Sequence, residues 1–454
     1  MAEESKKRDG FGSKLGIIAA AAGSAVGLGN IWRFPYMTGE NGGAAFILLY
    51  IACVFILGIP GMLCEFVVGR HGASNAVRAY QQFGHSPHWR IIGILGVITS
   101  MIILGFYAVV AGWCLQYLYA STTGSIIGDK AYVEQYFADF SSDALIPILW
   151  AIAFIAITHY IIAKGVRGGI ERASNVLMPT LLILLLIIAV ASCSLPGASD
   201  GIRFLFMPDF SKLTSSVLIE ALGQAFFSLS LGTACLCTYA SYFSKQTNLV
   251  GSATQIACLD SLIAILAGLM IFPAAAAVGV SPDSGPSLIF ITLPNVFSQA
   301  FVSMPAVGYI ISILFYLLLS MAALTSTISM HEIGTAFFHE ELQISRNNAA
   351  YIVTTICSVI AIFCSLSMGA YPDMQIMGMP ILSFCDSLTA DWLLPAGSLL
   401  TCILVGWFIP KHIVHDEFTN HGTVATHLYA IWLFLIRFVC PIAIIAIFIH
   451  QNMQ

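Results

Sequence analysis

Long apolar blocks, separated by short polar stretches, make up most of this 454-residue chain. Each block has about 20 or more residues, the length that a helix needs to cross a bilayer core of about 30 Å. We therefore predict an all-α integral membrane protein with eleven transmembrane helices, called segments 1 to 11 below. Their expected ranges are 14–38, 43–69, 91–121, 145–163, 173–195, 217–243, 251–280, 305–337, 348–367, 387–410 and 423–449.

Composition supports this assignment. Hydrophobic residues make up 58% of the chain and charged residues only 9%, whereas a soluble domain has about 25% charged residues. The first block is too long for the apolar core of a signal peptide, so we expect it to remain in the mature protein. The twelve cysteines lie almost entirely in apolar blocks, which indicates small buried side chains. No phosphate-binding loop of the G-x-x-x-x-G-K-S/T type occurs, and we expect neither nucleotide nor nucleic acid as a partner.

The distribution of positive charge predicts an orientation. If the N-terminus is cytoplasmic, thirteen Lys and Arg side chains lie on or near the inner side and three lie outside, in agreement with the positive-inside rule. The outer three are Lys130, Arg203 and Lys212. We expect a multi-pass protein of the plasma (inner) membrane with a cytoplasmic N-terminus. Eleven spans then place the C-terminus on the extracellular or periplasmic side.

Segments 1 and 6 contain interruptions that membrane helices usually avoid. Segment 1 reads GSAVGLGN over 23–30, and segment 6 reads SLSLGTA over 228–234. The two runs stand in matching places of two five-helix halves, and irregular backbone is tolerated at membrane depth where it is buried in protein or lines a cavity. Helix packing through Gly23 and Gly27, a small-x-x-x-small pair, is the alternative. We expect a 5+5 inverted repeat over 14–198 and 217–410, with segments 1 and 6 unwound at mid-membrane. A cytoplasmic stretch (1–13) precedes it, and an inner loop with segment 11 (411–454) follows.

Sequence motifs in these segments carry a family resemblance. Segment 1 contains GSAVGLGNIWRFPY over 23–36, followed by ENGG over 40–43, and segment 6 contains GQAFFSLSLG over 223–232. Further motifs are Gly58-Ile59-Pro60 with Glu65, Phe106-Tyr107 with Trp113, and the run 322–327. Together they resemble the neurotransmitter:sodium symporter family, which has the bacterial leucine-transporter fold. Eleven spans rather than twelve are similar to its shorter bacterial members.

The resemblance implies two Na⁺ sites. The first would use Ala25, Asn30, Ser228 and Asp260, and the second Gly23, Val26, Ala322, Thr325 and Ser326. Sodium is a hard cation that prefers oxygen ligands, and unwound backbone supplies carbonyl oxygens. The alternative for the two hydroxyl residues is back-bonding within their own helix. The alternative for Asp260 is an interhelical hydrogen bond from a protonated carboxyl. An ionised Asp260 would provide the negative charge that many animal members take from chloride.

The resemblance also implies an amino-acid substrate. At Gly27, carriers of biogenic amines hold an aspartate, so we expect Gly27 to leave space and no charge for an amine. An amino acid brings its own carboxylate, which would complete the first sodium shell and bind Tyr107 and the helix dipoles. Most pocket positions are apolar, which favours a neutral, hydrophobic side chain. Thr233 and Ala234 stand where the family often has glycines, so pocket size stays open. The implied substrate-binding set is Ala25, Val26, Gly29, Ile103, Tyr107, Phe227, Ser228, Ser230, Thr233, Ser329 and Met330.

Two gates follow from the same comparison. Arg33 would pair with Asp386 on the outer side, and Arg8 with Glu340 near Tyr242 on the inner side. Two solvated surface charges, worth about 0–1 kcal/mol, are the alternative for the inner pair.

Gly169 and Pro179 form a glycine-x9-proline motif at the inner end of segment 5. In some family members this stretch unwinds. A simple kink or cap is the alternative.

These features predict a sodium-coupled secondary active symporter of neutral, hydrophobic L-amino acids that works by alternating access. Transport of another small carboxylate, such as an amino-acid derivative, is the alternative within the same fold. An ion channel and an intramembrane enzyme are alternatives from other classes. The sequence contains no catalytic dyad or zinc motif for an enzyme, and it leaves the oligomeric state open.

Overall fold

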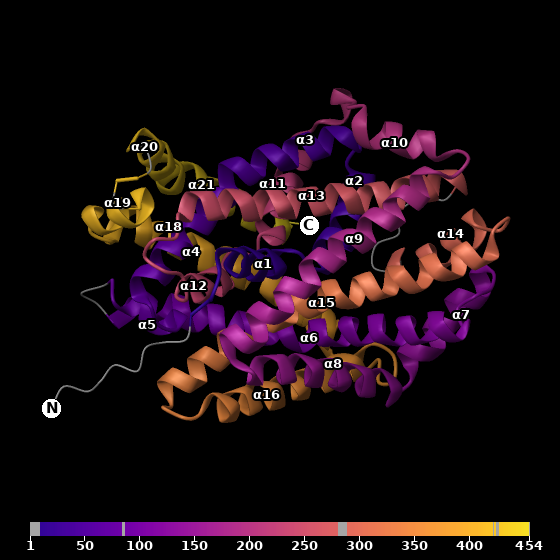
Figure 1. The fold of residues 1–454 in the computed structure, drawn as a ribbon, viewed down its shortest axis with the longest axis horizontal. Coiled ribbons are helices and arrows are strands. Elements are labelled where there is room, and N and C mark those ends of the chain that lie inside the picture. Colours follow the sequence, from indigo (N-terminus) through magenta and orange to yellow (C-terminus); the bar gives the residue numbers. More distant parts are fainter. Residues whose placement is uncertain (1–9, 84–86, 280–287, 421, 424–425, 454) are drawn as a thin grey trace.

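A computed structural model describes residues 10–83, 87–279, 288–420, 422–423 and 426–453. Figure 1 shows long helices that run along one common direction, with short helices at both ends. The helices are α1 (Lys14–Ala25), α2 (Phe34–Glu40), α3 (Ala44–Cys53), α4 (Ile59–Gly72), α5 (Ala76–Gln81), α6 (Arg90–Thr123), α7 (Lys130–Ser142), α8 (Ile146–Ala163), α9 (Arg172–Cys193), α10 (Ala198–Phe206), α11 (Ser215–Ser228), α12 (Cys235–Ala240), α13 (Leu249–Ala277), α14 (Leu293–Ala300), α15 (Pro305–Glu341), α16 (Arg346–Ser367), α17 (Ile381–Ser387), α18 (Leu394–Ile403), α19 (Lys411–Thr419), α20 (Thr426–Phe434) and α21 (Cys440–Met453).

Short wide or tight helical turns extend several of these helices. The wide turns are η1 (Gly29–Arg33), η2 (Val54–Gly58), η4 (Val166–Glu171), η6 (Leu288–Thr292), η7 (Leu388–Leu393), η8 (Leu404–Phe408) and η9 (Leu435–Val439). The tight turns are η3 (Pro87–Trp89) and η5 (Phe210–Lys212). The strands β1 (Gln375–Ile376) and β2 (Met379–Pro380) form an antiparallel hairpin in which Gln375 pairs with Pro380.

Nine helices within the described residues are long and apolar enough to cross a membrane. They are Ala44–Gly72, Arg90–Thr123, Ile146–Ala163, Val166–Cys193, Leu249–Ala277, Pro305–Glu341, Arg346–Ser367, Ile381–Phe408 and His427–Gln451. Leu15–Ala25 and Gly29–Glu40 add a pair bent by 55°. Each falls on one predicted segment. Segment 6 corresponds to α11 and α12, which are too short to qualify singly. The count of eleven therefore stays a prediction.

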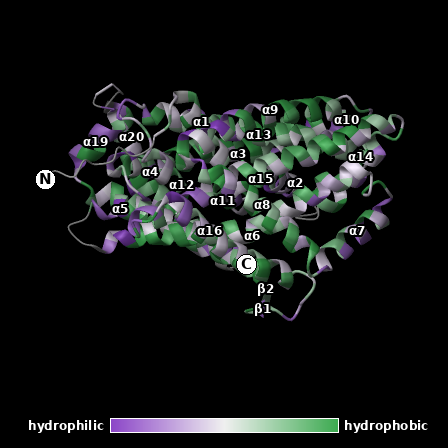
Figure 2. Cartoon of the chain, turned by 60° about the horizontal axis from the view of Figure 1, so that its bottom comes forward, coloured by the Kyte–Doolittle hydropathy of each residue, from purple (hydrophilic) through white to green (hydrophobic). Residues whose placement is uncertain are grey.

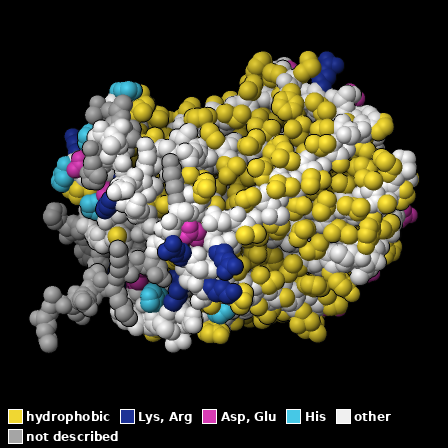
Figure 3. Space-filling model, in the orientation of Figure 1, with side chains coloured by type: hydrophobic (Ala, Val, Ile, Leu, Met, Phe, Trp, Pro, Cys, Tyr) yellow, Lys and Arg dark blue, Asp and Glu magenta, His cyan; other side chains and the backbone are white. Residues whose placement is uncertain are grey.

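The surface agrees with a membrane location. Figure 2 shows hydrophobic residues along the helices in the middle of the molecule, and Figure 3 shows hydrophobic side chains over the same region of one face. In Figure 3, most of the Lys, Arg and His side chains gather toward the end that also carries α5 and α19 in Figure 1. Large apolar side chains along the long helices are half or more exposed, including Val190 (65%) and Ile183 (57%). A surface of this kind is stable against lipid and not against water.

Helices α6, α8, α15 and α16 pack together. The close approach of α6 to α8 requires small residues. A Cβ on Gly112 of α6 would lie only 2.6 Å from the backbone nitrogen of Ala151 in α8, which is too short a distance. Polar bonds join the same helices in their interior. The hydroxyls of Thr158 and Thr327 are 2.9 Å apart, and Thr354 lies within 2.9 Å of a ring nitrogen of His331. We call α6, α8, α15 and α16 the scaffold group.

Segment 5 is helical from Val166 to Cys193, so the glycine-x9-proline stretch is not unwound in this structure. Gly169 lies in the wide turn η4. A Cβ there would be 2.0 Å from the carbonyl oxygen of Ile161, so glycine is required for the close approach to α8. Pro179 stays inside the continuous helix α9.

A buried ion cluster fastens α19 to the end of α4. Glu417 accepts hydrogen bonds from Arg70 Nε at 2.5 Å and from Lys245 Nζ at 2.9 Å, and its other neighbour is His71 at 3.2 Å. The Arg70 side chain is fully buried and also donates to Thr247 O and to Glu417 O. Burial alone would raise the pKa of Glu417, but hydrogen bonds from His71 and Lys245 and the charge of Arg70 lower it to about 2.

This cluster makes stability depend on pH. The pKa of Glu417 in the fold (about 2) is lower than the unfolded value of about 4.3. The stabilisation is therefore complete above about pH 4.3 and is lost as pH falls toward 2. We predict that Glu417→Gln lowers the melting temperature strongly at pH 7, since breaking a buried pair costs about 3–5 kcal/mol. The difference from the unmodified protein should shrink at pH 3, as measured by tryptophan fluorescence in detergent.

Glu134→Gln provides the control, because Glu134 is 49% exposed and, within the described residues, its ion-pair partner is Lys130 on the surface of α7. It should leave the melting temperature almost unchanged at both pH values. An equal loss for Glu417→Gln at pH 7 and pH 3 would contradict the assignment of this stabilisation to the ionised carboxylate.

Candidate functional site

Two helices are interrupted next to each other in the interior. Helix α1 ends at Ala25, Val26 is extended (φ −75°, ψ 106°), and helical turns resume at Gly29. Helix α11 ends at Ser228 and α12 begins at Cys235. Between these two helices, Ser230 (φ 53°) and Ala234 (φ 59°) adopt left-handed conformations that cost about 1–2 kcal/mol each in non-glycine residues. Local sequence preference therefore does not explain this backbone, and surrounding contacts must hold it.

The buried Glu65 of α4 provides such contacts. Its carboxylate accepts hydrogen bonds from the backbone nitrogens of Gly232 at 2.8 Å and Cys237 at 3.2 Å. These N–H groups lose helical partners where segment 6 is interrupted, and an unpaired N–H in apolar surroundings is costly. Sequence reasoning quoted Glu65 only as part of a motif. A carboxylate inside an apolar segment was the available signal for its role.

A first polar cluster joins η1, α11 and α13. Asp260 accepts hydrogen bonds from Asn30 Nδ2 at 2.6 Å, Ser228 Oγ at 2.8 Å and Tyr50 OH at 3.0 Å. Asp260 and Asn30 have no solvent exposure. Both carboxylate oxygens thus act as acceptors, an arrangement suited to the ionised form. The pattern of the sequence did not indicate Tyr50, since a tyrosine in an apolar segment gives no signal of its own.

A second polar cluster joins the break in segment 1 to α15. Thr325 Oγ1 donates to Val26 O at 3.1 Å and to Ala322 O at 2.9 Å. Ser326 Oγ lies 3.5 Å from Val26 O and 3.4 Å from Ala322 O. Back-bonding within α15 accounts for the bonds to Ala322 but not for those to Val26. Gly23 lies beside this cluster, because a Cβ on it would be 3.3 Å from Thr325 Cβ. The donor set of carbonyl and hydroxyl oxygens suits a hard monovalent cation.

A cavity of about 90 Å³ lies beside both clusters. Ten of the eleven predicted substrate residues line it: Ala25, Gly29, Ile103, Tyr107, Phe227, Ser228, Ser230, Thr233, Ser329 and Met330. The remaining one, Val26, is fully buried, and its carbonyl faces the second cluster. Sequence reasoning did not place Phe106, Thr389 or Leu394 in the wall, although they belong to it.

The expectation that Gly27 leaves free space is wrong. A Cβ on Gly27 would lie 2.4 Å from Ser326 Oγ and 3.1 Å from Tyr107 OH. These two hydroxyls already fill the position that a side chain would take. Tyr107 OH also accepts a hydrogen bond from Leu28 N at 3.0 Å, which satisfies a backbone group of the break. Glycine at 27 is thus needed for close approach.

The predicted outer gate is not closed by an ion pair. Among the described residues, no Arg33 nitrogen comes within 4.0 Å of an Asp386 oxygen. Arg33 stacks instead on Phe227, with its guanidinium carbon 4.3 Å from the ring centroid. Asp386 and Phe227 both line the cavity. Arg33, which lies over Phe227, and Asp386 are therefore both next to the cavity without forming an ion pair.

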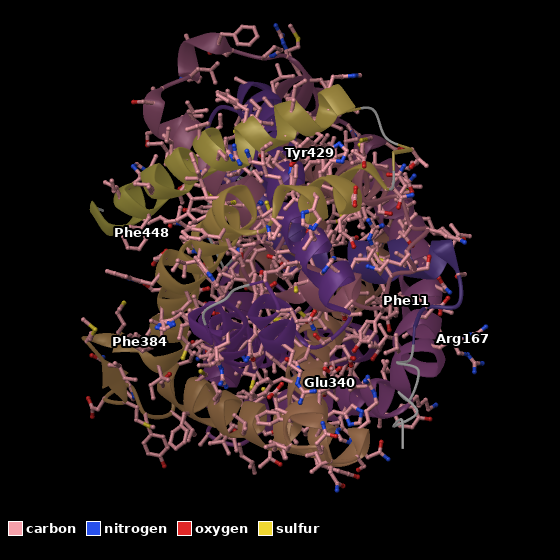
Figure 4. All side chains as sticks on the ribbon, turned by 90° about the vertical axis from the view of Figure 1, so that its left-hand side faces the viewer. Phe11, Arg167, Glu340, Phe384, Tyr429 and Phe448 are labelled. Carbon is pink, nitrogen blue, oxygen red and sulfur yellow. The ribbon has the colours of Figure 1, made fainter. Side chains whose placement is uncertain are left out.

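The predicted inner gate is described only in part, because Arg8 lies outside the described residues. Glu340 accepts hydrogen bonds from Asn75 N at 2.7 Å and Asn75 Nδ2 at 3.0 Å. Tyr242 OH donates to Glu332 at 2.7 Å, and Glu332 pairs with Arg346. Sequence reasoning missed this buried pair, for which a glutamate at the inner end of segment 8 was the only signal. Figure 4 views the molecule from the left-hand side of Figure 1 and labels Glu340 and Phe11.

Comparison with known proteins identifies the family. The model of the sodium:neurotransmitter symporter family matches residues 8–135 and 137–454. The chain belongs to this family. The predicted resemblance is therefore confirmed, and the chain is a multi-pass membrane protein of a transporter family.

Relatives of this symporter span its full length. An uncharacterized sodium-dependent transporter of Bacillus subtilis, YhdH, is 36% identical over 442 residues, 97% of each chain. An uncharacterized sodium-dependent transporter of Haemophilus influenzae is 34% identical over 465 residues, covering 99% of this chain and 100% of its own. A crystal structure of MhsT in complex with L-phenylalanine has a TM-score of 0.88 and 40% identity, and the match covers 98% of the symporter and 100% of MhsT.

The packing around Gly27 yields a prediction. In Gly27→Ala, the new Cβ would be 2.4 Å from Ser326 Oγ, so the hydroxyl or the break must move. Overpacking of this kind costs about 1–3 kcal/mol. Because it acts on the second cluster, the sodium concentration that gives half-maximal thermal stabilisation should rise about tenfold or more.

Gly168→Ala is the matched control, since nothing lies within 4 Å of a Cβ at that position. It should keep the sodium response of the unmodified symporter. An unchanged response in Gly27→Ala would show that Ser326 moves aside without cost.

Proposed function

We propose that this symporter carries neutral, hydrophobic L-amino acids together with two Na⁺ ions. The observation that supports the proposal most is the position of the cavity between two oxygen clusters, both built on the interrupted helices. In this proposal the chain has eleven spans in a 5+5 inverted repeat, with segments 1 and 6 unwound at mid-membrane. Its N-terminus is cytoplasmic and its C-terminus is extracellular or periplasmic.

The first Na⁺ would be bound by the Ala25 carbonyl, Asn30, Ser228 and Asp260. Asp260 supplies a full negative charge, whereas the other three groups are neutral. Burying a cation is costly unless an anion lies beside it. A fixed carboxylate meets this requirement, so transport would need no chloride. The substrate carboxylate would complete the shell of this ion from the cavity.

The second Na⁺ would be bound by the carbonyls of Gly23, Val26 and Ala322 and the hydroxyls of Thr325 and Ser326. Because Thr325 and Ser326 belong to α15 while Val26 belongs to the break in segment 1, this ion would hold segment 1 against the scaffold group. Its loss would release the contact. Coupling of sodium to the conformational change would arise in this way.

The cavity wall supports an amino-acid substrate. At about 10–15 Å³ for one water-sized group, the cavity of about 90 Å³ holds several such groups, and a whole hydrophobic amino acid would need the wall to move outward. Tyr107 would receive the carboxylate, and Ile103, Phe106, Phe227 and Met330 form an apolar wall for the side chain. MhsT, whose solved complex contains L-phenylalanine, gives independent support for this class.

Alternating access would proceed by movement of α1 and α12 against the scaffold group. On the outer side, Arg33 would leave Phe227 and approach Asp386 when substrate is enclosed. On the inner side, Arg8, Glu340 and Tyr242 would close the path. Each gate would use charges that lie next to the cavity or to the ends of the moving helices.

An uptake experiment tests the substrate class. In proteoliposomes with an inward sodium gradient, uptake of labelled L-leucine should be inhibited by unlabelled neutral, hydrophobic L-amino acids. Charged amino acids, and amines without a carboxylate such as tyramine, should not compete. Uptake that proceeds equally without sodium, or that amines inhibit as well as their parent amino acids do, would refute the proposal.

A double variant tests the second sodium site. Thr325→Ala combined with Ser326→Ala removes two ligands, so sodium-stimulated uptake should fall at least a hundredfold. Thr327→Ala is the matched control: it removes the hydroxyl of the next residue on α15, which bonds to Thr158 of the scaffold group. The control should retain sodium stimulation. A double variant with normal sodium dependence would exclude these ligands.

A further inference from the structure

Three exposed cations lie on the connection between α8 and α9. Lys164 follows α8, Arg167 lies in η4, and Arg172 begins α9. Within the described part of the chain, none of them has a carboxylate oxygen within 4.0 Å. We call Lys164, Arg167 and Arg172 the connector patch. Figure 3 shows a group of dark-blue side chains at the border between the yellow face and the polar end, and Figure 4 shows Arg167 pointing outward from the ribbon.

Four other cations at this end of the molecule have anionic partners, whereas Arg90 and Lys411 have none among the described residues. The pairs are Arg70–Glu417, Arg78–Glu341, Lys245–Glu417 and Arg346–Glu332. The one acidic residue in the connection, Glu171, is buried, and it accepts hydrogen bonds from Gly12 N at 2.7 Å and Ser13 Oγ at 2.8 Å. Its oxygens are therefore engaged with the segment before α1. The positive charge of the connector patch is left for a group outside this chain.

Exposed apolar side chains of α8 and α9 lie on the same helix faces as Lys164 and Arg172. On α8, Ile157 (41% exposed) and Tyr160 (63%) precede Lys164 by seven and four residues. On α9, Val176 (62%) and Ile183 (57%) follow Arg172 by four and eleven residues. Residues at such spacings share one face of a helix. Both apolar stripes thus end in a cation, and Figure 1 shows the two helices converging at the connection.

The Lys164 ammonium is held toward the lipid-facing stripe. It donates a hydrogen bond to Tyr160 OH at 2.7 Å and lies 4.0 Å from the centroid of the Tyr160 ring. Tyrosine and lysine with this exposure are typical of the boundary between the acyl chains and the headgroups. The charge therefore lies at the depth where a phospholipid carries its phosphate.

We propose that the connector patch binds the phosphate of an anionic phospholipid, with the acyl chains lying along the stripes of α8 and α9. Cation and phosphate form charge-assisted hydrogen bonds, and juxtamembrane Lys and Arg attract anionic lipids. A lipid matches the site better than free phosphate does, because the same cations continue into apolar stripes. The proposal rests on the membrane placement of the chain and not on its substrate or its sodium sites.

Native mass spectrometry of the purified full-length chain tests this. Detergent-solubilised protein is titrated with phosphatidylglycerol or phosphatidylcholine of equal chain length. The double variant Lys164→Gln with Arg172→Gln should bind at least fivefold less phosphatidylglycerol than the unmodified protein. Its binding of phosphatidylcholine should be unchanged. Arg167 is kept in this variant because it also lines a separate cavity next to Gly12.

Arg90→Gln with Lys411→Gln is the matched control, since both residues are exposed and belong to other parts of the chain. It loses the same charge and should keep phosphatidylglycerol binding. Equal losses in both double variants would overturn the proposal in favour of general attraction. Complete displacement of the lipid by 10 mM inorganic phosphate would overturn the choice of a lipid.

Lys164→Arg with Arg172→Lys keeps the charges and guards against misfolding as an explanation. It should bind phosphatidylglycerol like the unmodified protein, and a loss equal to that of the glutamine variant would contradict the charge-based site. Because retained lipid is the readout, failure of sodium-driven uptake would leave this result interpretable. Conversely, loss of lipid binding with intact uptake would reject this site alone.

Discussion

The need to satisfy freed backbone groups in apolar surroundings controls the centre of this structure. Where segments 1 and 6 are interrupted, N–H and C=O groups lose their helical partners and water cannot replace them. Side chains from other helices form the missing hydrogen bonds. Glu65 accepts from two backbone N–H groups of segment 6, Tyr107 OH accepts from Leu28 N, and Thr325 Oγ1 donates to Val26 O. Under the proposed function, oxygen atoms of Val26 and Thr325 that meet this requirement would also bind a hard cation. Structural and ligand-binding requirements would then coincide in these residues.

Helix α15 has two faces with different tasks. Thr327 and His331 bond to α8 and α16 of the scaffold group, at 2.9 Å to Thr158 and 2.9 Å to Thr354. Thr325 and Ser329 face the opposite way, toward Val26 and toward the Tyr239 hydroxyl at 2.8 Å. The scaffold contacts lie between continuous helices, whereas the others reach the interrupted ones. A cation bound beside Thr325 would thus affect the position of segment 1, while the contacts within the scaffold group would not change.

Sequence reasoning found most of the apolar segments because their length is set by the bilayer. It proposed unwinding in segments 1 and 6 because glycine and serine runs stand in matching places of the two halves. It placed Asn30, Ser228 and Asp260 in one site through a family motif, and the structure brings these three together. Side chains that distant segments contribute to the site were harder to predict from the sequence. Tyr50 and Glu332 act through tertiary contacts that no local pattern contains. Gly27 was misjudged because the space beside a glycine depends on what packs there, here Ser326 and Tyr107.

The position of Arg33 shows how charge and packing combine at the cavity. Its guanidinium lies over the Phe227 ring, and the same ring contacts the backbone at Gly29, where a Cβ would be 3.1 Å from Phe227 Cε1. Phe227 therefore lies between a cation and the break in segment 1. A substrate side chain that moves this ring would shift Arg33 as well, because the stacking interaction attracts the cation to the face of the ring. If the cavity binds substrate as proposed, its occupation and the position of Arg33 would in this way be linked through one aromatic side chain.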